Sequence, residues 1–147
     1  MVHQTNWAGN YTYSATRYHF PTTVAEVQEI VRRSNKVRVL GSRHSFNGIA
    51  DSTEDLISLE RFDPALRLDR ERHTVTVSAG MTYGELCQTL HSTGYAIPNM
   101  ASLPHITVIG ACSTATHGSG DAIGNLATAV AALEMSDGRW RGSHPGA

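Results

Sequence analysis

The feature that most constrains the fold is an apolar, β-branched run that stops abruptly in a loop of small residues. The run is Val37–Leu40, and the loop after it is Gly41–Asn47. An apolar run of this length beside turn residues predicts a buried strand. Backbone N–H groups in such a loop can approach a bulky anionic group, because glycine has no Cβ and serine adds a short donor. His44 would lie beside whatever the loop holds.

The segments around this strand predict a small parallel α/β lobe. Thr23 and Glu26 have the spacing of a capping box, and apolar residues then recur at helical spacing to about residue 35. A further short strand is predicted at Leu56–Leu59. A helix between apolar strands is typical of nucleotide-binding α/β units.

The second half of the chain predicts an antiparallel lobe with helices. Alternating residues in Leu66–Asp69 and Thr74–Ser78 favour a hairpin. Thr82 and Glu85 form a second capping box, and the helix that they begin ends at Gly94. The remaining expectations are a short helix at Val108–Ser113, a strand at Ala131–Met135 and a turn at Asp137-Gly138.

Composition excludes several classes of protein. The chain has 147 residues, the size of one domain, and its 40% hydrophobic content allows a packed core. A net charge of -1 argues against nucleic-acid binding, and no apolar stretch is long enough for a transmembrane segment. The eight histidines have no metal-ligand spacing, so we expect no metal site. We expect Cys87 and Cys112 to be buried free thiols, which favours a reducing, cytoplasmic location.

Three ordered motifs resemble the FAD-binding (PCMH-type) domain of vanillyl-alcohol-oxidase-type flavoproteins. They are Gly41–Asn47, Pro98–Gly110 and Thr114–Gly120. Within that family the chain is most similar to the alditol (xylitol) and aldonolactone oxidases, including the opening Thr5–Asn10. The resemblance implies a two-lobed α+β fold. It implies an N-terminal arm at residues 1–10 and an FAD-binding domain at 11–147, C-terminally incomplete and without the substrate domain.

The resemblance also implies which residues contact FAD. His44 matches the histidine that is joined covalently to the flavin 8α-methyl carbon, a step that needs a neutral imidazole. The cofactor supplies the hydride chemistry, and the protein supplies placement and electrostatics. The implied cofactor-binding residues are Val39, Leu40, Gly41, Ser42, Arg43, His44, Ser45, Ser102, Thr107, Gly110, Thr114, Ala115, Thr116 and His117.

Two positions depart from the family pattern. Arg43 stands where close relatives have glycine, and Ala115 stands where the family often has glycine. If position 43 needs a positive φ, arginine carries a steric cost; if it does not, the guanidinium can pair with a phosphate. The methyl group of Ala115 either crowds the flavin or is harmless.

The function that this resemblance implies is oxidation of the CH–OH group of a sugar alcohol, with oxygen as acceptor and hydrogen peroxide as product. One alternative is an aldonolactone oxidase or dehydrogenase, and another is a non-catalytic fragment. In the family, the groups that bind substrate and abstract its proton come from a C-terminal domain. We therefore assign no catalytic residue here, and expect the chain alone not to turn over substrate.

Overall fold

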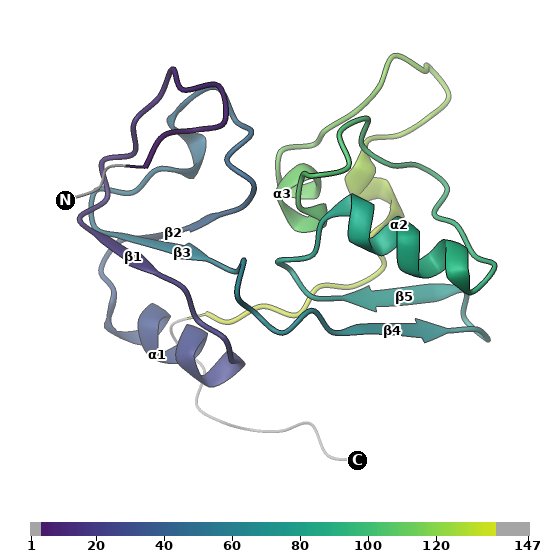
Figure 1. The fold of residues 1–147 in the computed structure, drawn as a ribbon, viewed down its shortest axis with the longest axis horizontal. Coiled ribbons are helices and arrows are strands. Elements are labelled where there is room, and N and C mark those ends of the chain that lie inside the picture. The colour runs from purple at the N-terminus through teal and green to yellow at the C-terminus, as the bar shows by residue number, and fades with distance from the viewer. Residues whose placement is uncertain (1–3, 138–147) are drawn as a thin grey trace.

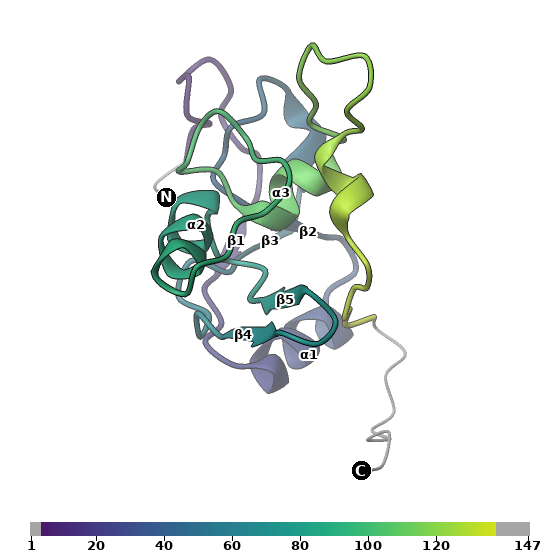
Figure 2. The same cartoon turned by 90° about the vertical axis from the view of Figure 1, so that its right-hand side faces the viewer.

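The computed structural model describes residues 4–137, which form two lobes joined by the segment at residues 59–65 (Figure 1). The first lobe holds a three-stranded sheet with one helix. The second holds a two-stranded sheet with two helices, and Figure 1 and Figure 2 show α2 and α3 on the same side of this hairpin. In chain order the elements are β1 (Arg17–His19), α1 (Val24–Arg33), β2 (Val37–Leu40), η1 (Gly48–Ala50), β3 (Asp55–Ser58), β4 (Leu66–Asp69), β5 (Thr74–Val77), α2 (Tyr83–Ser92), α3 (Val108–Ser113) and η2 (Leu126–Ala129).

The sheet of the first lobe is parallel, with β3 between β1 and β2. All four residues of β3 are buried, as expected for a central strand. The prediction that β2 is a buried strand was wrong in part, because only Leu40 is buried and Val39 is 55% exposed. Within the described chain β2 has a strand partner only in β3, which makes it an edge strand. Leu40 packs against Tyr13 and Leu56 in the core of this lobe.

Helix α1 begins where the capping residues predicted. The Thr23 side chain accepts a hydrogen bond from the backbone N–H of Glu26. The reciprocal half of the predicted capping box is different, since the Glu26 carboxylate accepts from the N–H and hydroxyl of Thr22. The Glu26 side chain therefore stabilises the start of α1 through Thr22, one residue before the predicted partner Thr23.

The second lobe is organised around the predicted hairpin. Strands β4 and β5 are antiparallel, and Val75 and Val77 pack against a core of Met81, Leu86 and Leu90. Both halves of the capping box at Thr82 and Glu85 are formed at the start of α2. Gly94, with a φ of +78°, follows the helix as predicted.

Two further expectations differ from the structure. Residues 131–137 are irregular rather than a strand, and Gly138 of the expected turn lies outside the described residues. A strand requires a hydrogen-bonded neighbour, and no described strand pairs with this segment. Cys87 and Cys112 are free as expected, but both are only partly buried. Across residues 4–137, every helix is too short or too polar to cross a bilayer.

Candidate functional site

The loop after β2 is held from one side by the N-terminal arm. The buried side chain of Asn6 donates through Nδ2 to the carbonyl oxygen of Ser45 at 2.9 Å. The backbone N–H of Trp7 donates to the carbonyl of Arg43 at 2.8 Å, and Asn10 Nδ2 donates to the carbonyl of Phe46 at 3.3 Å. Three carbonyls of the loop are therefore satisfied by residues of the arm.

The backbone N–H groups of the same loop are free to bind something else. Within residues 4–137, no N–H of residues 42–46 donates to another group of the chain. An array of unpaired N–H groups in a tight turn makes an anion-binding concavity. This arrangement agrees with the sequence-based expectation that the small-residue loop holds an anionic group.

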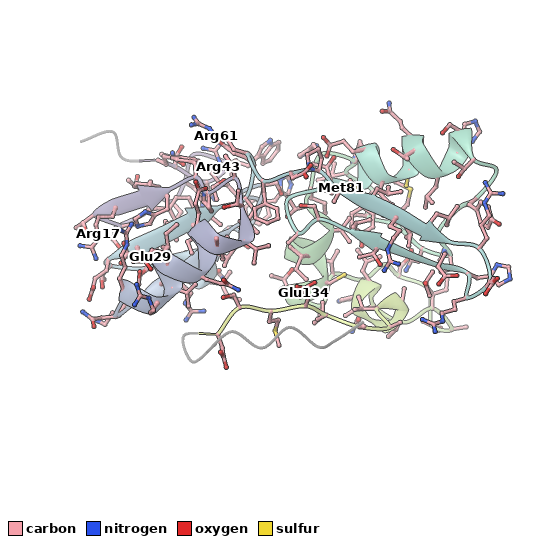
Figure 3. The ribbon with its side chains drawn as sticks, turned by 90° about the horizontal axis from the view of Figure 1, so that it is seen from below. Arg17, Glu29, Arg43, Arg61, Met81 and Glu134 are labelled. Atoms are coloured by element: carbon pink, nitrogen blue, oxygen red, sulfur yellow. The ribbon has the colours of Figure 1, made fainter. Side chains whose placement is uncertain are left out.

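Arg43 adopts a conformation that suits glycine. Its φ is +61°, in the left-handed region, and Ala115 has a φ of +51°. Both departures from the family pattern therefore fall where a side chain is strained. Of the two alternatives for position 43, the steric cost is present. Figure 3 shows the Arg43 side chain in the first lobe, near the boundary with the second.

We expect Arg43→Gly to raise the free energy of unfolding by about 0.5–1 kcal/mol, because relief of left-handed strain exceeds the added entropy of the unfolded chain. Urea denaturation measures the change. Arg38→Gly is the matched control: Arg38 is exposed in β2 without a positive φ, and glycine there is expected to destabilise. A loss of stability in Arg43→Gly would contradict the strain argument.

The two lobes meet at two glycines and one threonine. A Cβ on Gly41 of the first lobe would lie 2.7 Å from Thr107 Oγ1, and a Cβ on Gly110 would lie 2.5 Å from the same oxygen. The Thr107 hydroxyl is buried without a hydrogen-bond partner in the described chain. Absence of a side chain at both glycines thus lets the loop after β2 approach α3, with a polar atom between them.

His44 lies at the same junction. Its Nδ1 is buried and has no hydrogen-bond partner among the described residues. Burial lowers the pKa of His44, and the nearby His105 lowers the pKa further. The imidazole is therefore neutral at pH 7, the form in which a ring nitrogen has a lone pair available as a nucleophile.

The other predicted site residues are distributed around this junction. Thr107 and Gly110 contact the first lobe, whereas Leu40 turns its side chain into the core. Thr114 and Thr116 lie together after α3, with their hydroxyl oxygens 3.3 Å apart. His117 Nδ1 is 3.0 Å from the carbonyl of Gly118, a local contact. Ser102 is exposed on the loop between α2 and α3.

The residues at this junction fit an FAD. Free N–H groups of the loop suit a diphosphate, and the unpartnered Thr107 hydroxyl and His44 Nδ1 suit further contacts from the second lobe and the loop. Gly41 and Gly110 allow the Thr107 hydroxyl to lie between the loop after β2 and α3, because a Cβ at either position would meet that oxygen. Sequence reasoning did not identify Asn6 as a residue that supports the loop; the only signal was the polar Asn6 and Asn10 within the family-like opening.

Comparison with known proteins agrees with this assignment. A family model described as "FAD binding domain" matches residues 15–140. An alditol oxidase from Streptomyces sp. is 45% identical over 134 residues, which cover 89% of this chain and 32% of the relative. An L-gulonolactone oxidase from Mus musculus is 35% identical, over 88% of this chain and 30% of the relative. The chain thus spans about a third of the length of these curated relatives.

A solved structure supports the fold independently. The crystal structure of cholesterol oxidase from B. sterolicum matches with a TM-score of 0.71 and 17% sequence identity, over 80% of this chain and 24% of that chain. At this level of identity the likeness concerns the two-lobed α+β architecture alone. With this family match over most of its length, the chain belongs to the FAD binding domain family.

Proposed function

We propose that this chain is the FAD-binding part of an oxidoreductase that oxidises the CH–OH group of an alditol, with oxygen as acceptor and hydrogen peroxide as product. The observation that carries the proposal is the loop after β2: the arm holds three of its carbonyls, while the N–H groups of residues 42–46 donate to no group within residues 4–137. Identity of 45% to an alditol oxidase, against 35% to an L-gulonolactone oxidase, favours an alditol over an aldonolactone.

The chain's own residues would bind and orient the cofactor. Backbone N–H groups of residues 42–46 would hold the diphosphate, and the Thr107 hydroxyl would contact the cofactor from the second lobe. His44, neutral and partly buried, would carry the covalent bond to the flavin. When bound, FAD would supply hydride acceptance from the carbinol carbon and electron transfer to oxygen.

An aldonolactone oxidase or dehydrogenase is the second candidate. It rests on the similarity to the L-gulonolactone oxidase and to a D-arabinono-1,4-lactone oxidase from Saccharomyces cerevisiae, which is 32% identical. The rate at which substrate bleaches the flavin absorbance near 450 nm, with xylitol or sorbitol compared with L-gulono-1,4-lactone, separates the two in any protein that contains this chain. Faster oxidation of the lactone would overturn the alditol assignment.

We expect purified chain incubated with FAD to retain flavin after acid precipitation, and His44→Ala to lose all of this acid-stable flavin. The reason is that only a covalent bond survives unfolding. Absorbance of the washed precipitate near 450 nm, with intact mass, measures the bond.

His91→Ala is the matched control, since His91 is an exposed histidine at the end of α2, and it should keep the acid-stable flavin. If flavin binds but is released by acid, the proposed covalent link is wrong and the proposed FAD site still holds. No bound flavin would contradict the proposed function.

A further inference from the structure

Three aromatic rings surround the imidazole of His44. The Trp7 ring centroid is 4.6 Å from that of His44, the His105 centroid is 5.1 Å away, and the Phe46 centroid is 6.3 Å away. Phe46 and His105 present edge contacts, at interplanar angles of 66° and 61°. Trp7 also stacks on His105, with centroids 6.4 Å apart. Trp7 and His105 therefore form one cluster with the histidine expected to bond to the flavin.

This cluster is assembled from three separate segments. Trp7 belongs to the arm, where its backbone N–H donates to the carbonyl of Arg43, next to His44 in sequence. His105 precedes α3 in the second lobe, two residues before the buried Thr107. The Trp7 side chain is 62% exposed, so burial of its own surface is a weak reason for its position. Its ring covers His44 instead.

Ring contacts matter here because no hydrogen bond fixes the imidazole through Nδ1. A histidine ring is ordinarily oriented by a hydrogen bond from one nitrogen, which sets the direction of the other. Nδ1 of His44 is buried and without such a partner in the described chain. Of the three rings, His105 is the titratable one, and Trp7 and Phe46 carry no charge.

We propose that Trp7 and His105 are positioning residues for covalent flavin attachment, holding the His44 imidazole between the arm and the second lobe in the orientation that the bond requires. The inference rests on the proposed function and deepens it. Burial and His105 both lower the pKa of His44, which supports the same role by keeping the ring neutral. His105 thus acts through His44 and not on a substrate.

The attachment step balances with oxygen as the final oxidant. A bond forms between a ring nitrogen of His44 and the flavin 8α carbon, while one C–H bond of the methyl group and the imidazole N–H bond break. The two protons released from these bonds and the electron pair of the broken C–H bond would pass to the isoalloxazine, which would thereby be reduced. Molecular oxygen then takes two electrons and two protons and leaves as hydrogen peroxide, restoring the oxidised ring. The protein needs only to present the imidazole.

The experiment follows the rate of acid-stable flavin formation after FAD is added to the flavin-free chain, in wild type, Trp7→Ala, Trp7→Phe, His105→Gln and the control His91→Gln. We expect Trp7→Ala and His105→Gln to slow the covalent step by about tenfold, since small displacements of a reacting group carry large rate costs. Total bound flavin should stay unchanged. Trp7→Phe, which keeps a ring, should restore most of the rate.

A second readout needs no flavin. The pKa of His44, from the pH dependence of its ring proton NMR signals, should rise in His105→Gln, and the pH at which attachment becomes fast should rise with it. Equal covalent rates in wild type and both disruptive variants would overturn the inference and keep the proposed function. A chain that binds no FAD at all would overturn both.

Discussion

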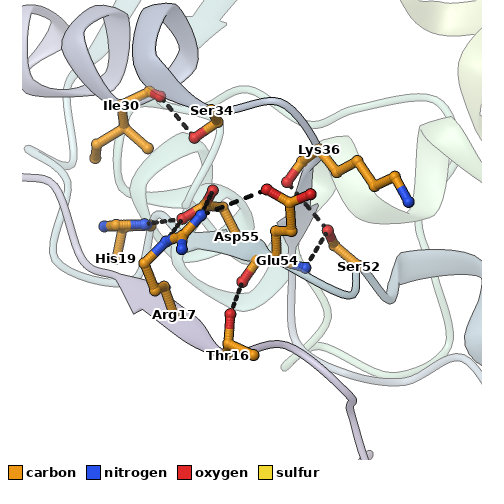
Figure 4. Close-up of polar contacts among 9 residues, drawn as sticks. All are labelled: Thr16, Arg17, His19, Ile30, Ser34, Lys36, Ser52, Glu54 and Asp55. Atoms are coloured by element: carbon orange, nitrogen blue, oxygen red, sulfur yellow. Dashed lines mark hydrogen bonds and ion pairs between the residues drawn. The ribbon is translucent and has the colours of Figure 1, made fainter.

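Asp55→Asn is expected to lower the free energy of unfolding at pH 7 by about 3 kcal/mol, at the lower end for breaking a buried ion pair. The Asp55 side chain is 2% exposed and accepts two hydrogen bonds from Arg17, each at 2.7 Å. His19 Nε2 lies 2.6 Å from the same carboxylate (Figure 4). We expect a loss at the lower end of that range because the Arg17 side chain is 55% exposed, so water can hydrate the guanidinium when its partner is no longer charged.

The same carboxylate makes stability depend on pH. Hydrogen bonds from Arg17, acting against burial, hold the pKa of Asp55 well below its usual range. A depressed folded-state pKa contributes stability that is fully present above the unfolded-state value, near pH 4, and is lost as pH falls toward the folded-state value. Unfolding measured by urea from pH 7 to pH 2.5 should therefore show a steeper loss below pH 4 in wild type than in Asp55→Asn.

Asp63→Asn provides the comparison for this prediction. Asp63 is an exposed carboxylate in the segment that joins the lobes, so its replacement should change stability by less than about 0.5 kcal/mol. An Asp55→Asn variant as stable as wild type, with an unchanged pH profile, would mean that the cluster contributes nothing to holding β1 on β3.

The elements that sequence predicted well are those with a local signal at each end. Helix α2 has a capping box at Thr82 and a left-handed glycine after its last turn, and both depend on residues within a few positions of each other. The burial of β2 was not predictable in this way. Whether Val39 is covered depends on the order of strands in the sheet, and β3 enters between β1 and β2 only later in the chain.

The residues of the candidate site also differ in whether a local sequence signal predicts them. The glycine and histidine of the loop after β2 are visible in a short motif, and the need for a neutral imidazole follows only from the family resemblance that the motif carries. Contacts from the arm are not, since Asn6 and Ser45 are 39 positions apart and pair only in the folded chain. The partnership of His44 with His105 likewise arises because the second lobe folds back against the first.

The junction of the lobes gives the second large effect, since Gly110→Ala should lower the free energy of unfolding by about 2 kcal/mol, as expected for overpacking. In an ordinary helix interior the same change would stabilise by about 1 kcal/mol. Here the new Cβ would lie 2.5 Å from Thr107 Oγ1, and that hydroxyl cannot move away freely because it also lies against Gly41. Thermal or urea unfolding of the variant gives the sign directly.

Removal of the obstructing oxygen tests the cause. Thr107→Ala deletes Oγ1, so the combination of Thr107→Ala with Gly110→Ala should be more stable than the sum of the single changes, by about 1–2 kcal/mol of coupling. Gly118→Ala is the matched control, because a Cβ there meets nothing within 4 Å. Additive effects at positions 107 and 110 would show that the threonine hydroxyl does not limit the packing. Positive coupling would instead establish that glycine is required at position 110 by its contact with the Thr107 side chain at the start of α3, independently of any cofactor.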